Sequence, residues 1–240
     1  MDTTPEPASP TSLSADLATG DLELLGLLPG SSNYTFLARL GDTGTLVVYK
    51  PRRGESPLWD FPQGTLCQRE AAAWVVCSAL GWCYVPPTIL RDGPHGTGMV
   101  QQYIEHDPKF HAFNLTPQYD DELKQIAIFD LIVNNADRKG GHLLATDAGH
   151  VWGVDHGICF AVEPKLRTVL WDFIGDPVPE DAVAAVETLC RALEGEIATQ
   201  IEGLLLPEEV EVLQRRAATI LKSPVFPEPG PGRPYPWPPI

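Results

Sequence analysis

The residue types best suited to chemistry gather around one glycine-rich turn in the second half of the chain. Asp137 and His142 precede the segment "LLATDAGHVWGV", and Asp155 and His156 follow it. The alternation on both sides of "DAG" predicts a hairpin, whose two ends are neighbours, so we expect His142 beside Asp155 and near Asp137. Carboxylates and imidazoles so arranged can hold a metal ion or move a proton, although carboxylates also cap turns without any further role.

A lysine in a predicted strand is the second chemical candidate. In "TLVVYK" the alternation places Leu46, Val48 and Lys50 on one face, which its apolar members predict to be an interior face. An ammonium group there needs an anionic partner. Glu70, in the first turn of a helix predicted to begin at the potential cap Thr65, is the nearest candidate.

A turn-forming cluster, "PGSSN", precedes this strand. Backbone N–H groups and small hydroxyls in such a loop can surround phosphate groups, so Ser31, Ser32 and Asn33 are candidate nucleotide contacts. By itself the loop is a weak signal. Together with the lysine strand, the helical glutamate and the two aspartates astride a hairpin, it completes the set of groups that kinases use.

The elements that must position these groups divide the chain into two halves. Strands dominate residues 15–105, apart from the helix after Thr65, whereas helices dominate residues 106–222. We therefore expect a β-rich lobe followed by an α-helical lobe. The two ends, 1–14 and 223–240, are rich in proline and are expected to lack stable structure.

Charge and cysteine content restrict the class of protein. The 240 residues include 17 basic and 32 acidic side chains, and the net charge of −15 repels nucleic acid and anionic lipid surfaces. The five cysteines form no C-x-x-C pair, which is typical of reduced thiols rather than of disulfides or a zinc site. Without a signal-peptide pattern or an apolar run long enough to span a bilayer, the sequence predicts a cytoplasmic monomer with no stable membrane association.

Several of these segments also resemble a known family. "DLIVNNADRKGGHLL" is similar to the catalytic loop of the phosphatidylinositol 3-/4-kinase-like superfamily, nearest the type II phosphatidylinositol 4-kinases and their small bacterial, actinobacterial-type relatives. "VWGVDHGICF" resembles the metal-binding segment of that family, "VVYKP" its ATP-lysine strand and "GMVQQYIE" its hinge. The resemblance covers roughly residues 22–220 and implies an α+β fold of the two-lobed protein-kinase type, with the ATP cleft between the lobes.

The resemblance also assigns roles to individual residues. Lys50, oriented by Glu70, would contact the ATP phosphates, and Asp137 would be the catalytic base or a carboxylate that orients the substrate. Arg138 would brace the catalytic loop, and Lys139 would point toward the γ-phosphate and offset developing charge. The remaining assignments are Gln101, Gln102 and Tyr103 as the hinge that holds adenine, and His142 and Asp155 as ligands of a divalent ion.

Two departures from the family pattern modify these expectations. The second metal ligand of the family is asparagine, and His142 stands in its place; imidazole suits Mn²⁺ or Zn²⁺ better than Mg²⁺, so manganese is predicted to be the better cofactor. The cysteine-rich palmitoylation insert of the eukaryotic lipid kinases is replaced by the short "RRGESPLWDFPQG". Without that anchor, and with an acidic surface, a soluble protein Ser/Thr is the expected acceptor.

Three classes of protein therefore remain open. The first is an ATP-dependent phosphotransferase that acts on a protein acceptor, on its own N-terminus or, as the alternative, on phosphatidylinositol. The second is a nucleotide-binding pseudokinase that serves as an interaction module, because His142 alters the metal site. The third is a metal-dependent hydrolase built on Asp137, His142 and Asp155, which gives no role to Lys50 or Glu70.

Overall fold

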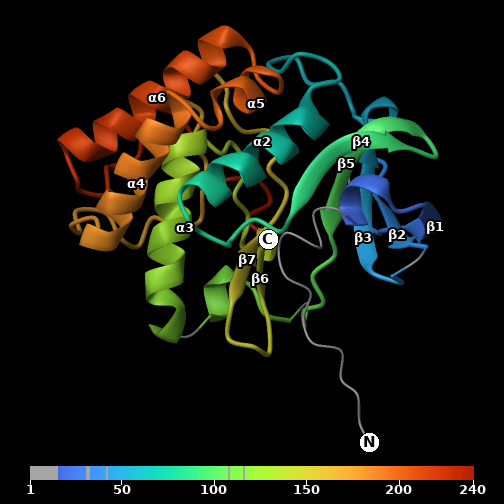
Figure 1. Cartoon of the computed structure of the whole chain (residues 1–240). Coiled ribbons are helices and arrows are strands. Elements are labelled where there is room, and N and C mark those ends of the chain that lie inside the picture. Colours follow the sequence, from blue (N-terminus) through green and yellow to red (C-terminus); the bar gives the residue numbers. More distant parts are fainter. Residues whose placement is uncertain (1–15, 31–32, 42, 108, 116) are drawn as a thin grey trace, which may run out of the picture.

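The chain folds into two lobes, as predicted. The computed structural model describes residues 16–30, 33–41, 43–107, 109–115 and 117–240, so the predictions for residues 1–14 and for Ser31 and Ser32 lie outside it. In Figure 1 the sheet lies on one side of the molecule and the helices α3, α4 and α6 on the other, with α2 between them.

The N-lobe is an antiparallel sheet with the strand order β1-β2-β3-β5-β4. One face of the sheet buries Ala38, Val47 and Tyr49, and Lys50 lies on the other face. The prediction that the face of Leu46 and Lys50 is the apolar interior was therefore wrong, because the sheet packs its core against the opposite face and leaves Leu46 exposed. Gly98 of β5 lies opposite Pro51, where a Cβ atom would overlap the carbonyl oxygen of Lys50. The strands are β1 (Leu22–Leu27), β2 (Phe36–Leu40), β3 (Leu46–Pro51), β4 (Thr88–Gly93) and β5 (Gly96–Gln102).

Helix α2 (Leu66–Ala79) joins the lobes because it is apolar on nearly every side. Ala72, Ala73 and Val76 are fully buried, as expected for a helix enclosed between other elements. Thr65 was predicted to cap the helix, but its hydroxyl donates to the carbonyl of Pro62 instead. The side chain of Glu55 accepts hydrogen bonds from the first two backbone N–H groups of α2, at 3.2 and 2.9 Å, and so caps the positive end of the helix dipole.

The C-lobe contains a helical core and one short hairpin. The predicted hairpin is present, with Leu143 paired to Gly153 and Ala145 paired to Val151. The helices and strands of the C-lobe are α3 (Asp120–Val133), β6 (Leu143–Ala145), β7 (Val151–Gly153), α4 (Glu180–Leu193), α5 (Ala198–Glu202) and α6 (Pro207–Lys222). Helices α2, α3, α4 and α6 contribute to a single apolar core.

The proline-rich segment after α6 packs against the C-lobe, contrary to the expectation of a segment without stable structure. Phe226 is only 5% exposed, and its ring lies 5.7 Å from that of Phe173. The carbonyl of Pro234 accepts hydrogen bonds from the backbone of Thr168 and from the indole of Trp171. Proline removes a backbone donor but not the acceptor, so such a segment can still be held by donors on its neighbours.

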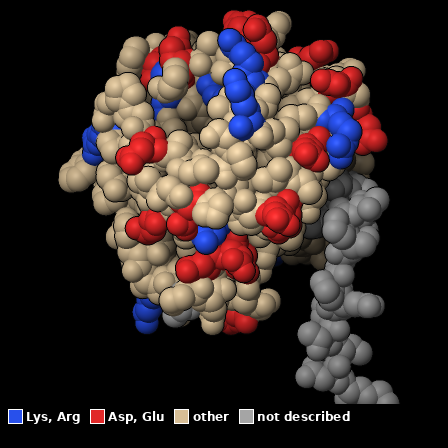
Figure 2. Space-filling view, turned by 90° about the vertical axis from the view of Figure 1, so that its left-hand side faces the viewer, with Lys and Arg blue, Asp and Glu red and all other residues tan. Residues whose placement is uncertain are grey.

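The surface is acidic, in keeping with the composition. Figure 2 shows acidic side chains gathered in several places over the face on which α3 and α4 lie, with basic side chains between them. None of the helices in the described part of the chain combines the length and the apolar character needed to cross a bilayer.

Candidate active site

Lys50 pairs with two carboxylates across the boundary between the lobes. Its Nζ lies 2.6 Å from Glu70 Oε1 and 3.0 Å from Asp155 Oδ1. Burial alone would lower the pKa of Lys50, but the charges of Asp155 and Glu70 outweigh that effect and raise it. The Lys50 charge in turn holds the pKa of Asp155 well below its usual value, so both groups are charged at neutral pH.

The position of Glu70 is fixed by its neighbours on α2. Arg69, the preceding residue, is 1% exposed and pairs with Glu209 of α6, and it donates a 2.6 Å hydrogen bond to the carbonyl of Cys159. These contacts attach α2 to the C-lobe. The second oxygen of Glu70 accepts the backbone N–H of His156 at 2.9 Å, which ties the lysine pair to the segment that carries Asp155.

Asp137 and Lys139 form the next pair of charges. Lys139 Nζ lies 3.3 Å from Asp137 Oδ2, and both side chains are about three-quarters buried. Burial raises the pKa of Asp137, although the Lys139 charge acts in the opposite direction. A carboxylate with a raised pKa is better suited to accept a proton than an ordinary surface aspartate.

Arg138 lies between these two residues in the sequence, but its side chain is buried in a hydrogen-bond network away from the cavity. Its guanidinium is fully buried and contacts both oxygens of Asp130, at 2.9 Å each, and the carbonyl of Val154 at 3.0 Å. It also lies 2.6 Å from His156 Nε2. Burial alone would lower the pKa of Arg138, and Asp130 outweighs it. Arg138 does not line the cavity, so any contribution it makes is through positioning.

Two consecutive asparagines shape the loop that follows α3 and carries Asp137. Asn134 ends the helix in the left-handed conformation, with a φ of 52°, which asparagine tolerates better than most residues. Its side chain donates to the carbonyls of Ala161 and Glu163. Asn135 accepts the backbone N–H of Asp137 at 3.0 Å and donates to Asp130 at 3.0 Å, so the loop and the buried network are joined.

The hairpin places His142 beside Asp155, as the alternation predicted. His142 Nε2 lies 3.4 Å from Asp155 Oδ2, the oxygen that Lys50 does not contact. Burial lowers the pKa of His142 to about 4, so the imidazole is neutral at pH 7. Asp155 itself has a φ of 62°, an unfavourable backbone conformation for a residue with a side chain.

These groups line a cavity between the lobes. It has a volume of about 260 Å³, and its lining consists of Asn33, Lys50, Pro51, Glu55, Ser56, Leu58, Leu66, Cys67, Glu70, Asp137, Asp155, Gly157 and Ile158. Glu55 therefore both caps α2 and borders the cavity. The charged residues occupy one part of the lining, and Leu58, Leu66 and Ile158 supply an apolar part.

Asp155 and His142 fit a divalent cation that also takes ligands from a phosphate. One is a charged carboxylate and the other a neutral imidazole, and both are forms that coordinate metal ions. Within the described residues no cluster of three or more His, Cys, Asp or Glu side chains is arranged to hold a metal.

The predicted hinge residues lie apart from this cavity. The backbone N–H of Gln102 donates to Pro87 O and that of Tyr103 to Leu46 O, both at 3.0 Å. The side chain of Gln101 is buried and donates to Thr88. Because these donors are used inside the sheet, a bound base would need other atoms of this segment.

The loop between β1 and β2 meets the cavity through Asn33. Its Oδ1 accepts the backbone N–H of Ser56 at 2.7 Å, which fastens this loop to the segment before α2. The structure therefore brings Asn33, Lys50, Glu70, Asp137 and Asp155 together around one space.

The sequence analysis missed the residues that hold the site in place through hydrogen bonds to its loop and to α2. Asp130, Asn135 and Glu55 were given no role, although a carboxylate on the apolar face of α3 implies a buried cationic partner. Glu55 carries no comparable signal, because it is separated from the helix it caps by a loop of no regular pattern.

Comparisons with known proteins identify a family and several relatives. A family model described as phosphatidylinositol 3- and 4-kinase matches residues 88–183, which include Asp137 and the hairpin. Protein Rv2133c of Mycobacterium tuberculosis is 42% identical over 261 residues, covering 93% of this chain and 94% of that protein.

Solved structures share the fold at low sequence identity. A Helicobacter pylori proinflammatory kinase, CtkA, superposes with a TM-score of 0.53 at 12% identity, covering 87% of this chain and 94% of the other. The golgi casein kinase superposes with a TM-score of 0.51 at 13% identity, covering 89% and 73%. Both are kinases, and at these identities the likeness concerns the fold alone.

Proposed function

Because the chain belongs to the phosphatidylinositol 3- and 4-kinase superfamily, as a relative of Rv2133c, we propose that it is an ATP-dependent phosphotransferase. The observation that carries the proposal is the contact between Lys50 and Asp155 at the edge of the cavity. One oxygen of Asp155 meets Lys50 and the other faces His142, and Asp137 lines the same cavity. This is the arrangement needed to hold a polyphosphate beside a proton acceptor.

In the proposed reaction each charged residue has one task. Lys50, held by Glu70, binds phosphate oxygens, and Lys139 offsets charge that develops on the transferred group. Asp137 orients the acceptor hydroxyl and receives its proton. The hydroxyl oxygen forms the new bond to phosphorus, and ADP departs with the electron pair of the bond that breaks.

Asp155 and His142 are the residues that would hold a divalent ion, which when bound neutralises phosphate charge. A neutral imidazole favours softer ions than Mg²⁺, so we propose Mn²⁺ as the preferred cofactor. We also propose that the segment Gln101–Tyr103 contacts adenine. It would do so through carbonyl or side-chain atoms, since two of its backbone N–H groups already donate hydrogen bonds within the protein.

The proposed acceptor is a protein Ser or Thr, the N-terminal segment of this chain included, rather than a lipid in a bilayer. Each Lys or Arg near an anionic leaflet contributes roughly 1 kcal/mol to the binding of a protein to that leaflet. Arg52 and Arg53 form one basic pair near the cavity, and the Arg53 guanidinium is engaged by His95. Two such groups supply roughly 2 kcal/mol against the repulsion of a chain with a net charge of −15.

A pseudokinase is the second candidate, and His142 is the specific observation in its favour. Incubation with γ-labelled ATP and Mn²⁺ or Mg²⁺ separates the two functions. We expect wild-type protein to transfer label, and Lys50→Met and Asp155→Asn each to reduce the rate by about 10²–10³-fold or more. Label on Thr3, Thr4 or Ser9 that Asp137→Ala abolishes would identify the chain itself as an acceptor.

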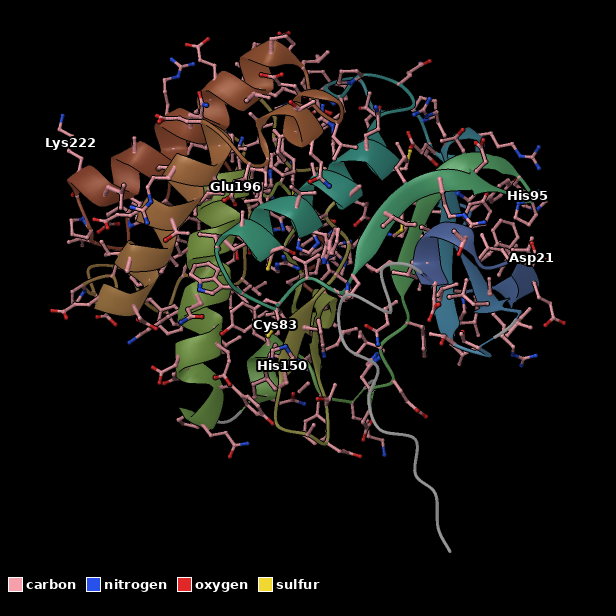
Figure 3. The ribbon with its side chains drawn as sticks, viewed as in Figure 1. Asp21, Cys83, His95, His150, Glu196 and Lys222 are labelled. Atoms are coloured by element: carbon pink, nitrogen blue, oxygen red, sulfur yellow. The ribbon has the colours of Figure 1, made fainter. Side chains whose placement is uncertain are left out.

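Lys222→Met is a matched control for Lys50→Met. Figure 3 shows Lys222 at the far end of α6, and its side chain is exposed. Nucleotide binding without transfer by the wild type would favour the pseudokinase. Label in phosphatidylinositol liposomes, with none on protein, would contradict the acceptor assignment.

A further inference from the structure

A second cavity lies next to Asp137, separate from the one that holds Lys50 and Asp155. Its volume is also about 260 Å³. Asp137 is the residue that the two linings share. The other residues that line it are Arg167, Arg233, Tyr235, Pro236 and Trp237. A group bound there would reach the catalytic carboxylate without entering the space assigned to the phosphates.

One wall of this cavity comes from the C-terminal segment, which is fastened on both sides of it. On one side, Pro234 O accepts hydrogen bonds from Thr168 N at 3.0 Å and Trp171 Nε1 at 3.1 Å. On the other, Pro239 O accepts the backbone N–H of Gly140, in the catalytic loop, at 2.7 Å. Figure 1 marks this end of the chain close to β7.

The segment between these two anchors is therefore held over the catalytic loop. A Cβ atom at Gly140 would lie 3.0 Å from the ring of Phe113 and 3.5 Å from Pro239 O, so the approach is tight. Pro236 is buried, whereas Tyr235 and Trp237 are 50% and 74% exposed. The wall is thus held by hydrogen bonds at its base and offers two exposed aromatic side chains, Tyr235 and Trp237.

The charges in this cavity favour an anion. Neither Arg167 nor Arg233 takes part in an ion pair recorded within the described part of the chain. The Arg167 charge acts on Asp137, whose pKa it lowers against the larger effect of burial, and Arg233 stacks on Trp237 at 5.2 Å. Each guanidinium group can donate two hydrogen bonds to the oxygens of a carboxylate or phosphate, while Asp137 can accept a hydrogen bond from a hydroxyl group.

We propose that this cavity is the acceptor site and that it selects a peptide Ser or Thr with an acidic side chain close to it. The proposal rests on the phosphotransferase function above and specifies its substrate class. The hydroxyl lies at Asp137, the neighbouring carboxylate at Arg167 and Arg233, and the peptide backbone packs against Tyr235 and Trp237. An acidic protein repels such a peptide at long range, so these local cations decide whether it binds.

The test compares two labelled peptides of equal length, with a central serine flanked by glutamate in one and by glutamine in the other. Binding is measured by fluorescence anisotropy and transfer by labelled ATP, both on the full chain. We expect the glutamate peptide to bind about tenfold more tightly or better, as for two charge-assisted contacts. Arg167→Gln and Arg233→Gln should each remove most of that difference between the two peptides.

Arg215→Gln is the matched control, since Arg215 is an exposed arginine on α6. Trp237→Ala removes one of the two exposed aromatic surfaces and should weaken binding of both peptides. Equal binding of the two peptides, or an Arg233→Gln variant that still discriminates, would overturn the proposal.

The binding readout separates this proposal from the function it rests on. Arginine-dependent binding of the glutamate peptide without any transfer would refute the phosphotransferase and leave an acidic-peptide site. Equal transfer to both peptides would retain the phosphotransferase and refute the acceptor preference. Transfer to phosphatidylinositol liposomes with none to either peptide would also refute it.

Discussion

Arg138 and Lys50 each pair with an aspartate, and the two pairs lie close together, yet their surroundings differ. The Arg138–Asp130 pair is 0% exposed on both sides, whereas the Lys50 and Asp155 side chains are 19% and 51% exposed. Every nitrogen of the Arg138 guanidinium has a partner within the protein. Lys50 and Asp155 border an open cavity.

The difference shows which charges hold the loop and which are available to a ligand. A buried pair cannot exchange its partner for a nucleotide, and removing one member leaves an unpaired charge in a dry place. A half-exposed pair loses less when it is broken, because water replaces the lost contacts. We therefore expect substitutions in the first pair to affect folding and substitutions in the second to affect activity.

The largest effect is expected for Asp130→Asn. The change is nearly isosteric but leaves Arg138 without a buried counter-charge, which should lower the free energy of unfolding by about 3–5 kcal/mol. Urea denaturation measures it, and Lys50→Met is the comparison. The double variant Asp130→Leu/Arg138→Met should recover part of the loss, because it removes both charges. Equal stabilities of Asp130→Asn and wild type would mean that the pair does not hold the loop.

A smaller effect is expected for His142→Asn, which alters the half-exposed site without removing a charge. The wild type should work better with Mn²⁺ than with Mg²⁺, and the asparagine variant should shift the preference toward Mg²⁺, because an amide oxygen suits that ion better than imidazole. Transfer rates across titrations of each metal give the ratio. An identical ratio in both proteins would exclude His142 as a ligand.

The smallest effect is expected for Cys83 and His150, which belong to neither of the two ion pairs compared above. Figure 3 shows Cys83 and His150 together, and His150 Nε2 lies 3.0 Å from the Cys83 carbonyl. A hydrogen bond from His150 lowers the pKa of the exposed Cys83 thiol, whereas burial raises the pKa of Cys67 to about 11 and of Cys77 to about 12.

A lowered thiol pKa means more thiolate at neutral pH, so Cys83 should be alkylated first and at a lower pH than the other cysteines. In His150→Gln the pKa should rise, and the alkylation rate of Cys83 at pH 7 should fall by a small factor. Mass spectrometry after brief iodoacetamide treatment across a pH series measures both. Simultaneous labelling of Cys83 and Cys77 would contradict the assignment.

The sequence predicted the parts of this site that depend on local pattern. Alternation around "DAG" was enough to bring His142 to Asp155. Alternation in "TLVVYK" predicted the strand and put Lys50 on the face of Leu46, but the buried apolar face is the opposite one. Two-lobed architecture followed from the order of strands and helices. In each case the signal lies within a single element or a single hairpin.

Contacts between distant segments were not predictable in this way. Glu55 displaces Thr65 as the cap of α2, and the C-terminal prolines accept hydrogen bonds from Gly140 and Thr168, because of how the lobes pack. Composition suggested a segment without structure there. A proline-rich stretch supplies carbonyl acceptors and apolar surface, and only the fold shows which donors face it.

The left-handed backbone at Asp155 has a consequence for the evolution of the site. A residue with a side chain is less stable there by about 1 kcal/mol than glycine, and asparagine tolerates the conformation better than most residues. The backbone conformation therefore does not favour aspartate over glycine or asparagine at this position. What the carboxylate adds is its contacts with Lys50 and His142, so replacement of Asp155 among relatives would mark the loss of those contacts rather than a change in the turn.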